Sequence, residues 1–487
     1  MRKFILGLDE GTTSARSVLY DVNSHEIVDS EGKPFKQFYP HSGWVEQDPE
    51  EIYKVIMSTS RSIFRRQEIS KSELVGIGIT NQRETVVAWN RLTGEPIYNA
   101  IVWMDRRTSE NIDKLSSKTK VLIQKKTGLI PNAYFSASKM QWIMENVKQA
   151  KELAREYNLC FGTIDCYLAY KLTGNFVTDT TNASRTMLMN IHTLEWDDEL
   201  LKIFNIPKHC LPEIKACDAH FGDVPKMMGA PLCSMIGDQM SSLVGQGGVE
   251  MGNTKVTYGT GGFILSNIGT TSDKSVPSML TTVASTLNGK TQYAIEGSIY
   301  SACSAINWLK NNLEFFRSPS ETEAMAKSLK DNEGVYVVPA FTGLGAPYWN
   351  DNARAMIYGM TFNTNKNHIV RATLESMAYN TKAIFDEMKT YGQEFKVISV
   401  DGGGSNNKFL LQFLADMLNH NIMKSKYSES TVLGCIFVAM LSQKIIKLND
   451  IKLLTKSSET YKPKMKAQER DKLYEGWTKA VDSCMEE

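Results

Sequence analysis

Short apolar runs that alternate with longer segments of helical period restrict the possible folds of this chain more than any other sequence feature. Each run ends at glycine or polar residues, and its enrichment in Val, Ile and Leu is typical of β-strands. The clearest runs are FILGLD (4–9), SVLYD (17–21), LVGIGIT (74–80), VYVVPA (335–340) and KVISV (396–400). The alternation predicts an α/β protein, and a length of 487 residues allows two to four domains.

Glycine-rich turns occur at corresponding places in two halves of the chain. A Gly-Thr-Thr-Ser turn (11–14) follows the strand that ends at Asp9, and Gly-Thr-Gly-Gly (259–262) precedes a second apolar run. A third turn, Gly-Gly-Gly (402–404), follows the last of the predicted strands above. Backbone N–H groups and hydroxyls in such turns can bind phosphate from opposite walls of a cleft.

No Pro-rich linker or low-complexity tract separates the halves. Glycine instead concentrates at residues 245–252, where we place a hinge. The sequence therefore predicts an N-terminal domain at 1–248 and a C-terminal domain at 249–487.

Composition excludes several classes of protein. The formal net charge is +1, so the chain has no surplus of positive charge for a nucleic acid or an anionic membrane. The longest apolar run, residues 431–441, is about half of what a bilayer crossing needs, and the N-terminal run becomes polar too early for a signal peptide. We expect a cytoplasmic protein without a transmembrane segment. Eight cysteines without a CxxC pair predict reduced core residues rather than a metal site.

The familiar phosphate-binding fingerprints are absent. No glycine cluster matches GxGxxG, and NGKT (288–291) lacks the leading glycine of a Walker loop because Ala284 stands there. The remaining candidates are the glycine turns, with Arg16 close enough to add a charged contact to phosphate. Asp9 is placed to orient hydrated magnesium, and a turn-capping role is its alternative. Asp238 precedes a predicted helix, where an N-cap role is the alternative to a role in a site.

A larger set of colinear runs resembles the FGGY family of carbohydrate kinases, and within it the branch that phosphorylates glycerol. NQRET (81–85) and VPAFTGLGAPYW (338–349) are specific to that branch. The runs are LDEGTTSAR (8–16), GWVEQDP (43–49), GIGITNQRET (76–85), IYNAIVW (97–103), DRRT (105–108), AYFSASK (133–139), TNASRTML (181–188), GDQ (237–239), TYGTGGF (257–263), VYVVPAFTGLGAPYW (335–349), RATLES (371–376) and VDGGG (400–404).

The resemblance implies two actin-like (ribonuclease H-like) ATPase domains that flank a central cleft. It implies transfer of phosphate from ATP to glycerol, with Mg²⁺, to give sn-glycerol 3-phosphate. It also implies a homo-oligomer, a dimer or a tetramer.

Site residues follow from the resemblance position by position. Asp238 would be the general base, and Asp9 and Asp238 would flank magnesium. The residues implied for the glycerol hydroxyls are Arg83, Glu84, Tyr134, Asp238 and Gln239, with Trp103 and Phe263 on the carbon chain. Those implied for the nucleotide are Thr12, Thr13, Ser14, Arg16 and Thr260 at the phosphates, and Cys303, Asn307, Gly403 and Asn407 toward the adenosine.

The implied glycerol pocket makes chemical sense. A triol has no charge, so selectivity requires several paired donors and acceptors and an aromatic wall for its C–H face. Without the resemblance, Arg83 and Glu84 would be interpreted as a surface ion pair and Trp103 as a core residue.

Several residues depart from the pattern of the family. Cys303 and Asn307, in EGSIYSACSAINWL (296–309), replace the usual Gly and Gln near the nucleotide, and Met104 replaces a common Gln. Met-Ser-Ser (240–242) replaces Gln-Ala-Ala. His220 is expected to be a surface histidine. Two alternatives stay open: a kinase of another small polyol or sugar, and a non-catalytic actin-like nucleotide-binding protein.

Overall fold

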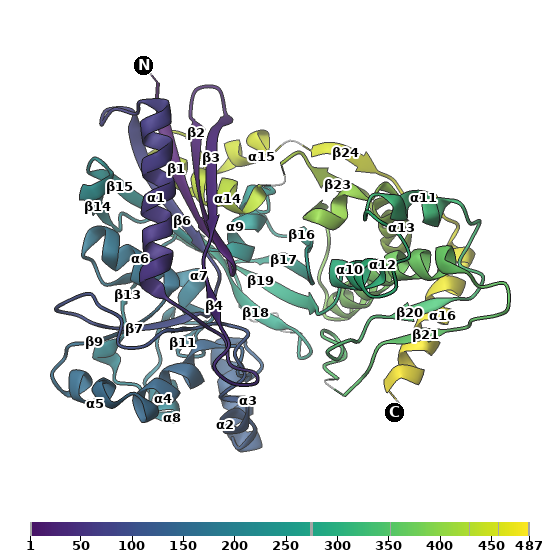
Figure 1. Cartoon of the computed structure of the whole chain (residues 1–487), viewed down its shortest axis with the longest axis horizontal. Helices are drawn as coiled ribbons and strands as arrows, with labels where there is room; N and C mark the ends of the chain where they lie inside the picture. Colours follow the sequence, from purple (N-terminus) through teal and green to yellow (C-terminus); the bar gives the residue numbers. More distant parts are fainter. Residues whose placement is uncertain (1, 273–275, 351, 428, 456, 486–487) are drawn as a thin grey trace.

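Two large mixed sheets, one from each half of the chain, form the framework of the molecule (Figure 1). The computed structural model describes residues 2–272, 276–350, 352–427, 429–455 and 457–485. Helices cover both sheets, so the predicted α/β class is confirmed.

The N-terminal sheet has six strands. Its order is β14 (Gly222–Val224), β15 (Ala230–Gly237), β6 (Leu74–Asn81), β1 (Phe4–Glu10), β2 (Ser14–Asp21) and β3 (Glu26–Pro34). Strands β1, β2 and β3 form an antiparallel meander, whereas β6 pairs parallel to β1 and β15 pairs parallel to β6.

The C-terminal sheet has seven strands. Its order is β18 (Leu280–Leu287), β19 (Lys290–Ile299), β17 (Gly262–Gly269), β16 (Asn253–Tyr258), β22 (Val397–Asp401), β23 (Ile422–Ser425) and β24 (Ser457–Tyr461). Strands β16, β17 and β19 form an antiparallel meander, and β22 and β23 continue the sheet in parallel from β16.

The two sheets therefore contain the same arrangement of an antiparallel meander followed by two parallel strands. The turns at 11–14 and 259–262 each join the first two strands of a meander, which explains their repetition in the sequence. Because the carboxyl ends of parallel strands meet at one edge of a sheet, the turns of each half gather at one edge.

Smaller elements complete the two halves. A five-stranded sheet in the N-terminal half contains β4 (Gln37–Phe38), β5 (Glu46–Gln47), β8 (Ala100–Ile101), β7 (Val86–Asn90) and β9 (Leu159–Thr163). The paired short strands are β10 (Val177–Asp179) with β13 (Glu213–Lys215), β11 (Met189–Asn190) with β12 (Glu195–Trp196), and β20 (Tyr336–Val338) with β21 (Met356–Tyr358). The helices are α1 (Pro49–Gln67), α2 (Ser109–Asp113), α3 (Ser117–Thr127), α4 (Ser136–Asn146), α5 (Lys148–Arg155), α6 (Ile164–Thr173), α7 (Thr180–Ala183), α8 (Asp198–Phe204), α9 (Asp238–Gly245), α10 (Cys303–Asn311), α11 (Glu321–Lys327), α12 (Lys366–Thr390), α13 (Lys408–Leu418), α14 (Ser430–Ser442), α15 (Ile451–Leu454) and α16 (Ala467–Met485), with short 3-10 turns at η1 (Lys208–Cys210), η2 (Pro225–Met227), η3 (Gly403–Asn406) and η4 (Leu448–Asp450).

Local sequence explains where helix α1 begins. The Asp48 carboxylate accepts a hydrogen bond from the Glu50 N–H at 2.9 Å, and Pro49 occupies the first helical position, where its missing N–H has no cost. The apolar face, which includes Ile52 and Ile56, is fully buried in the core of the N-terminal half.

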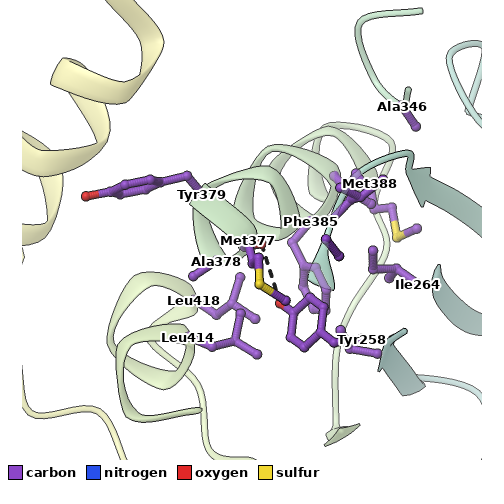
Figure 2. Packing of buried hydrophobic residues seen from close by; sticks show 14 of the residues in the cluster. Tyr258, Ile264, Ala346, Met377, Ala378, Tyr379, Phe385, Met388, Leu414 and Leu418 are labelled. Carbon is purple, nitrogen blue, oxygen red and sulfur yellow. Dashed lines mark hydrogen bonds between the residues drawn. The ribbon is translucent and has the colours of Figure 1, made fainter. Parts of the chain in front are cut away.

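The core of the C-terminal half lies between its sheet and helices α12 and α13. Figure 2 shows Tyr258 of β16 beside Met377 of α12 and Leu414 of α13. The Tyr258 hydroxyl forms a hydrogen bond with Thr381 Oγ1 at 2.7 Å, which satisfies its polar atom inside an apolar environment.

Helix α14 belongs to the C-terminal half of the sequence but packs on the N-terminal sheet and on α9. It contains the longest apolar run of the chain, and Val432 and Ile436 contact the N-terminal sheet where it carries Gly7. A Cβ at Gly434 would lie 1.8 Å from the Ser241 carbonyl oxygen of α9. The two helices therefore approach each other so closely that only glycine fits at this crossing.

We predict that Gly434→Ala destabilises the protein by about 1–3 kcal/mol, because the added methyl must push α9 and α14 apart. Alanine has the higher helix propensity, so helix formation alone would predict the opposite sign. The free energy of unfolding from urea denaturation measures the effect. Gly32→Ala is the matched control, since its Cβ would meet no atom closer than 3.5 Å. Equal stability of the two variants would contradict this account of the helix crossing.

Seven of the eight cysteines are buried, as the sequence predicts, whereas Cys303 lines a cavity. All eight are free, and Cys303 is half-buried. In the described part of the chain, no group of three or more His, Cys, Asp or Glu side chains is arranged to hold a metal ion. Across the same residues, none of the helices has the length and apolar character that a membrane crossing requires.

Candidate active site

A cavity of about 620 Å³ lies between the two halves of the chain. Its lining comes from turns and strand ends of both large sheets and from the loops around the five-stranded sheet. The predicted site residues in this lining are Thr12, Thr13, Trp103, Tyr134, Thr260 and Phe263. The structure thus brings together residues that are up to 251 positions apart in the printed sequence.

Arg83 and Asp238 contact each other but are not part of the lining of this cavity, and the charge of Arg83 acts on Tyr134 of that lining. Arg83 follows the end of β6, and Asp238 is the first residue of α9, directly after β15, which pairs with β6. Arg83 Nε lies 3.1 Å from Asp238 Oδ1, which also accepts a hydrogen bond from the Gln239 N–H at 2.7 Å. The Asp238 side chain is 29% exposed, whereas that of Arg83 is 2% exposed. Gly237, rather than Asp238, occupies the N-cap position, so the N-cap alternative for Asp238 is wrong.

Glu84 has an unusual backbone conformation for its residue type. Its φ is +62°, in the left-handed region that side chains rarely adopt, and such strain persists only where surrounding contacts hold it. Arg185 Nε pairs with the Glu84 carboxylate at 2.5 Å, and the Ser136 hydroxyl donates to the Glu84 carbonyl at 2.9 Å. Burial raises the pKa of Glu84, and the charge of Arg185 opposes the shift.

Arg83 and Glu84 therefore do not form the surface ion pair that they would suggest without the family resemblance. Both are buried, and each pairs with a different partner. Arg83 makes a two-pronged contact with Glu296 of β19, with Nη1–Oε2 at 2.7 Å and Nη2–Oε1 at 3.0 Å. Arg185 also approaches Glu296, with Nη1–Oε2 at 3.3 Å. Burial alone would raise the pKa of Glu296, but the charges of Arg185 and Arg83 outweigh it and lower the pKa to about 2.

Trp103 and Tyr134 form an aromatic wall of the cavity. Their rings meet edge to face with centroids 5.5 Å apart, and Trp103 Nε1 donates to Thr12 Oγ1 at 3.0 Å. Trp103 is half-buried and lines the cavity, so it is not an ordinary core residue. The wall therefore contacts the predicted phosphate turn directly. Burial raises the pKa of the Tyr134 hydroxyl, which stays protonated.

A fully buried lysine holds the main chain of this wall through hydrogen bonds. Lys139 of α4 donates to the carbonyl oxygens of Ala133, Tyr134 (3.0 Å) and Trp103 (3.5 Å). Burial lowers the pKa of Lys139 from its ordinary value of 10.5 to about 7. This role could not be predicted from the spacing of residues, because only the tertiary structure places the three carbonyls around one amino group.

We predict that the pH dependence of stability depends on Lys139. Since its folded pKa of about 7 lies below the unfolded value, the unfolded chain binds more protons above pH 7, and the free energy of unfolding should rise with pH from about 7 toward 10. In Lys139→Met this contribution to the rise should disappear. Urea denaturation at pH 6.5 and pH 9 measures it, with Lys114→Met, whose side chain is 70% exposed, as the control. The same pH slope in wild type and Lys139→Met would refute the assignment.

Asp9 lies at the carboxyl end of β1 and pairs with Arg16 at 2.8 Å. Arg16 also forms an ion pair with Glu429, which stands next to α14 in the C-terminal half. Burial raises the pKa of Asp9, and the contact with Arg16 opposes the shift. The nearby charge of Asp238 raises it further, so the two carboxylates lie within electrostatic reach of each other. The turn-capping alternative does not account for the Asp9 contacts.

This pair of carboxylates fits a magnesium ion. Mg²⁺ retains waters and binds through one or two carboxylates together with substrate phosphates, so Asp9 and Asp238 would suffice without a cage of protein ligands. The charge of Asp238 contributes to the raised pKa of Asp9, and a cation bound by both carboxylates would offset this repulsion.

The two predicted phosphate turns lie in the cavity lining, one from each half. Thr12 and Thr13 come from the β1–β2 turn, and Thr260 comes from the β16–β17 turn. Ser14 is exposed at the start of β2 and does not line the cavity. The Thr260 carbonyl accepts hydrogen bonds from the N–H groups of Ala302 and Ser304 at 3.0 and 3.1 Å, which fixes the turn against the start of α10.

A second cavity, of about 510 Å³, lies within the C-terminal half. Cys303, Asn307, Gly403 and Asn407, the four residues predicted toward the adenosine, all line it. Gly402, directly before Gly403, has a φ of +82°, and a Cβ there would lie 2.5 Å from the Tyr258 carbonyl oxygen, so the turn requires glycine. Asn407 caps α13 through its Oδ1 and donates to Thr322. Its amide therefore has a structural role in addition to lining the cavity.

Gln239 is held by a second buried lysine that the sequence analysis missed. Lys255 Nζ donates to Gln239 Oε1 at 2.6 Å and to Thr257 Oγ1 at 2.8 Å. Burial lowers the pKa of Lys255 to about 8, and the charges of Asp401 and Asp238 oppose the shift.

The departures from the family pattern make specific contacts. Met240 Sδ lies 3.5 Å from Arg83 Nη1, and the Ser241 hydroxyl donates to the Thr431 carbonyl of α14 at 2.6 Å. Ser242 donates to Asp401 at 3.3 Å. The two serines therefore join α9 to the C-terminal half. His220 has 60% of its side chain exposed, which confirms it as a surface histidine.

Sequence reasoning missed Arg185, Glu296, Lys139, Lys255 and Glu429. Three of them lie in runs that were singled out for the family resemblance or its departures, namely TNASRTML, AYFSASK and EGSIYSACSAINWL. Membership in these runs is the only sequence signal for them. None of their partners can be identified from spacing.

With two duplicated domains around a cavity lined by aromatic and hydroxyl residues, the structure has the architecture of a two-domain sugar or polyol kinase. Models of the FGGY family of carbohydrate kinases match residues 4–245 with the N-terminal domain and residues 254–442 with the C-terminal domain. The chain belongs to this family.

Individual proteins of known class match the chain over nearly its whole length. Glycerol kinases of Thermococcus onnurineus and Thermococcus kodakarensis are each 45% identical to the chain, over 100% of its length and 98% of theirs. The crystal structure of Plasmodium falciparum glycerol kinase with ADP superposes with a TM-score of 0.94 at 40% identity, covering 99% of this chain and 98% of that one. A gluconate kinase of Lactobacillus acidophilus shares the fold, with a TM-score of 0.89 at 24% identity over 99% of this chain and 98% of that one.

Proposed function

We propose that the chain phosphorylates glycerol, using ATP, to give sn-glycerol 3-phosphate. The observation that carries the proposal is the contact of Arg83 with Asp238 beside the Trp103–Tyr134 wall, in a chain 45% identical over its whole length to glycerol kinases. This arrangement offers charged donors and acceptors for hydroxyl groups and an aromatic face for a carbon chain.

Asp238 is the proposed general base. Its Oδ1 is held by Arg83 and by the Gln239 N–H, so its other oxygen can accept the proton of a substrate hydroxyl. A hydroxyl is far less acidic than a carboxylic acid, so the proton moves to Asp238 only as the bond between oxygen and phosphorus forms. The first role of Asp238 is therefore to orient the hydroxyl toward the γ-phosphate.

The other predicted residues have supporting roles in the proposal. Gln239, Glu84 and Tyr134 would pair with the remaining hydroxyls, and Phe263 would close the apolar face. Thr12, Thr13, Ser14 and Arg16 would bind the phosphates from one wall and Thr260 from the other. The cavity with Cys303, Asn307, Gly403 and Asn407 would hold the adenosine.

A magnesium ion held by Asp9 and Asp238 would supply charge neutralisation at the phosphate oxygens. Arg16, which pairs with both Asp9 and Glu429, brings a further positive charge to the same edge of the sheet. Closure of the two halves would exclude water, which competes with glycerol as a nucleophile.

We expect Asp238→Asn to lower kcat by roughly 10²–10⁴, the range for loss of a general base, because the amide cannot accept the proton. A coupled assay of ADP release at saturating glycerol and ATP measures this. Asp223→Asn, at a carboxylate whose side chain is 68% exposed, should retain wild-type kcat. A kcat of Asp238→Asn within tenfold of wild type would remove Asp238 from this role.

Arg83→Ala should mainly raise the KM for glycerol, because a substrate hydroxyl loses its charged partner. The KM for ATP should change little. Steady-state kinetics with each substrate varied in turn separates the two effects, and Arg66→Ala, at a half-exposed ion pair of α1, controls for the loss of a charge. If only the KM for ATP rose, the assignment of Arg83 to the glycerol pocket would be wrong.

The two alternatives can be tested directly. The ADP-release assay with glycerol, dihydroxyacetone, erythritol, xylulose and gluconate tests for a kinase of another polyol or sugar. A non-catalytic nucleotide-binding protein would release no ADP with any of them and would show no heat of binding with glycerol.

Three further features remain proposals. We infer a domain division at 248/249, which the two family matches and the separate sheets support. We also propose a cytoplasmic location and a homo-oligomer, a dimer or a tetramer. Gel filtration with light scattering tests the oligomer.

A further inference from the structure

Five charged side chains form a continuous row in which neighbouring charges have opposite signs. The order is Glu84, Arg185, Glu296, Arg83 and Asp238. The first four side chains are at most 2% exposed, whereas that of Asp238 is 29% exposed. Buried charges of this kind are stable only when each has a close partner of opposite sign.

Glu296 is the one member of this row that comes from the C-terminal half. It lies on β19, where Leu265 of β17 and Leu280 of β18 are its neighbours on either side. The backbone of Glu296 is therefore fixed by two strands of the C-terminal sheet. The C-terminal sheet therefore determines where the Glu296 carboxylate lies.

The guanidinium of Arg83 contacts both halves of the chain. Nη1 and Nη2 face the two oxygens of Glu296, while Nε faces Asp238 Oδ1. A guanidinium is planar and rigid, so the two-pronged contact with Glu296 fixes the direction in which Nε points. The C-terminal sheet thereby determines the contact between Arg83 and Asp238.

Charge balance indicates what Glu296 does for Asp238. With Glu296 present, the charge of Arg83 has a buried partner, and Asp238 needs to contribute only one oxygen to Arg83. Without the Glu296 charge, Asp238 would be the remaining carboxylate that forms a close ion pair with Arg83. It would turn toward the guanidinium and away from the cleft.

We propose that Glu296 is a positioning residue, which acts through Arg83 to hold Asp238 toward the substrate hydroxyl and couples the placement of the C-terminal sheet to the glycerol end of the site. This inference rests on the function proposed above. Arg185 supports the same arrangement, because it pairs with Glu296 and with the strained Glu84.

The test is a double-mutant cycle of Glu296→Gln and Arg83→Ala. Glutamine keeps the shape of the side chain and removes its charge, and we expect kcat/KM for glycerol to fall on the order of 10²-fold, as for the loss of one partner of a buried ion pair. The dissociation constant for ADP, measured by calorimetry without glycerol, should stay within threefold of wild type. If Glu296 acts through Arg83, the double variant should be no worse than Arg83→Ala by more than threefold.

Glu375→Gln is the matched control. Glu375 is also fully buried and pairs with an arginine, Arg371, at 2.7 Å, but both residues belong to α12. The same chemical change there should lower stability and leave the KM for glycerol unchanged. Glu296→Asp, which keeps the charge, should recover part of the activity and takes the place of Glu296→Gln in the cycle if the glutamine variant does not fold.

The outcomes separate the inference from the proposed function. The positioning role would be overturned if the losses of kcat/KM in Glu296→Gln and Arg83→Ala multiplied in the double variant. It would also be overturned if Glu375→Gln lost as much kcat/KM as Glu296→Gln. Either result would leave the proposed phosphorylation of glycerol intact. If wild type phosphorylates a different polyol, the proposed function fails, and the same cycle with that polyol still tests the positioning role.

Discussion

The close contact between α9 and α14 determines how the two halves of this chain are placed. Glycine at 434 lets the two helix backbones approach each other, and α14 carries the apolar run that packs on the N-terminal sheet. Because α9 begins at Asp238 and α14 begins next to Glu429, the same contact places groups from both halves beside Asp9 and Arg16. A helix contributed by the C-terminal half is thus part of the N-terminal core.

The predicted site residues lie at the ends of strands in the two large sheets. Strands β1, β6 and β15 are neighbours in parallel, and they end at or near Asp9, Arg83 and Asp238 respectively. The sheet topology therefore brings a predicted metal ligand, a predicted substrate ligand and the proposed general base to one edge without any long loop. In the other half, the turn with Thr260 occupies the corresponding edge.

The site is held by buried charge rather than by apolar packing alone. Lys139 fixes the aromatic wall through main-chain carbonyls, Lys255 fixes Gln239, and Glu296 pairs with Arg83 across the boundary between halves. Each buried charge is expensive unless its partner is in place, so these contacts favour one arrangement of the site over others. These contacts would hold the proposed glycerol pocket in that arrangement.

The sequence by itself determined the class of fold and the strand–turn–strand pattern at both phosphate turns, and it predicted six of the residues that line the cavity, namely Thr12, Thr13, Trp103, Tyr134, Thr260 and Phe263. These features depend on local rules: the period of apolar residues, the need for glycine in particular turns, and the order of short motifs. Only the tertiary structure decided that Arg83 pairs with Glu296, a residue 213 positions away, and that Lys139 gathers three carbonyls. The pairing of buried charges depends on the distance between two sheets and the direction of each side chain, and neither quantity is encoded in the spacing of residues along the chain.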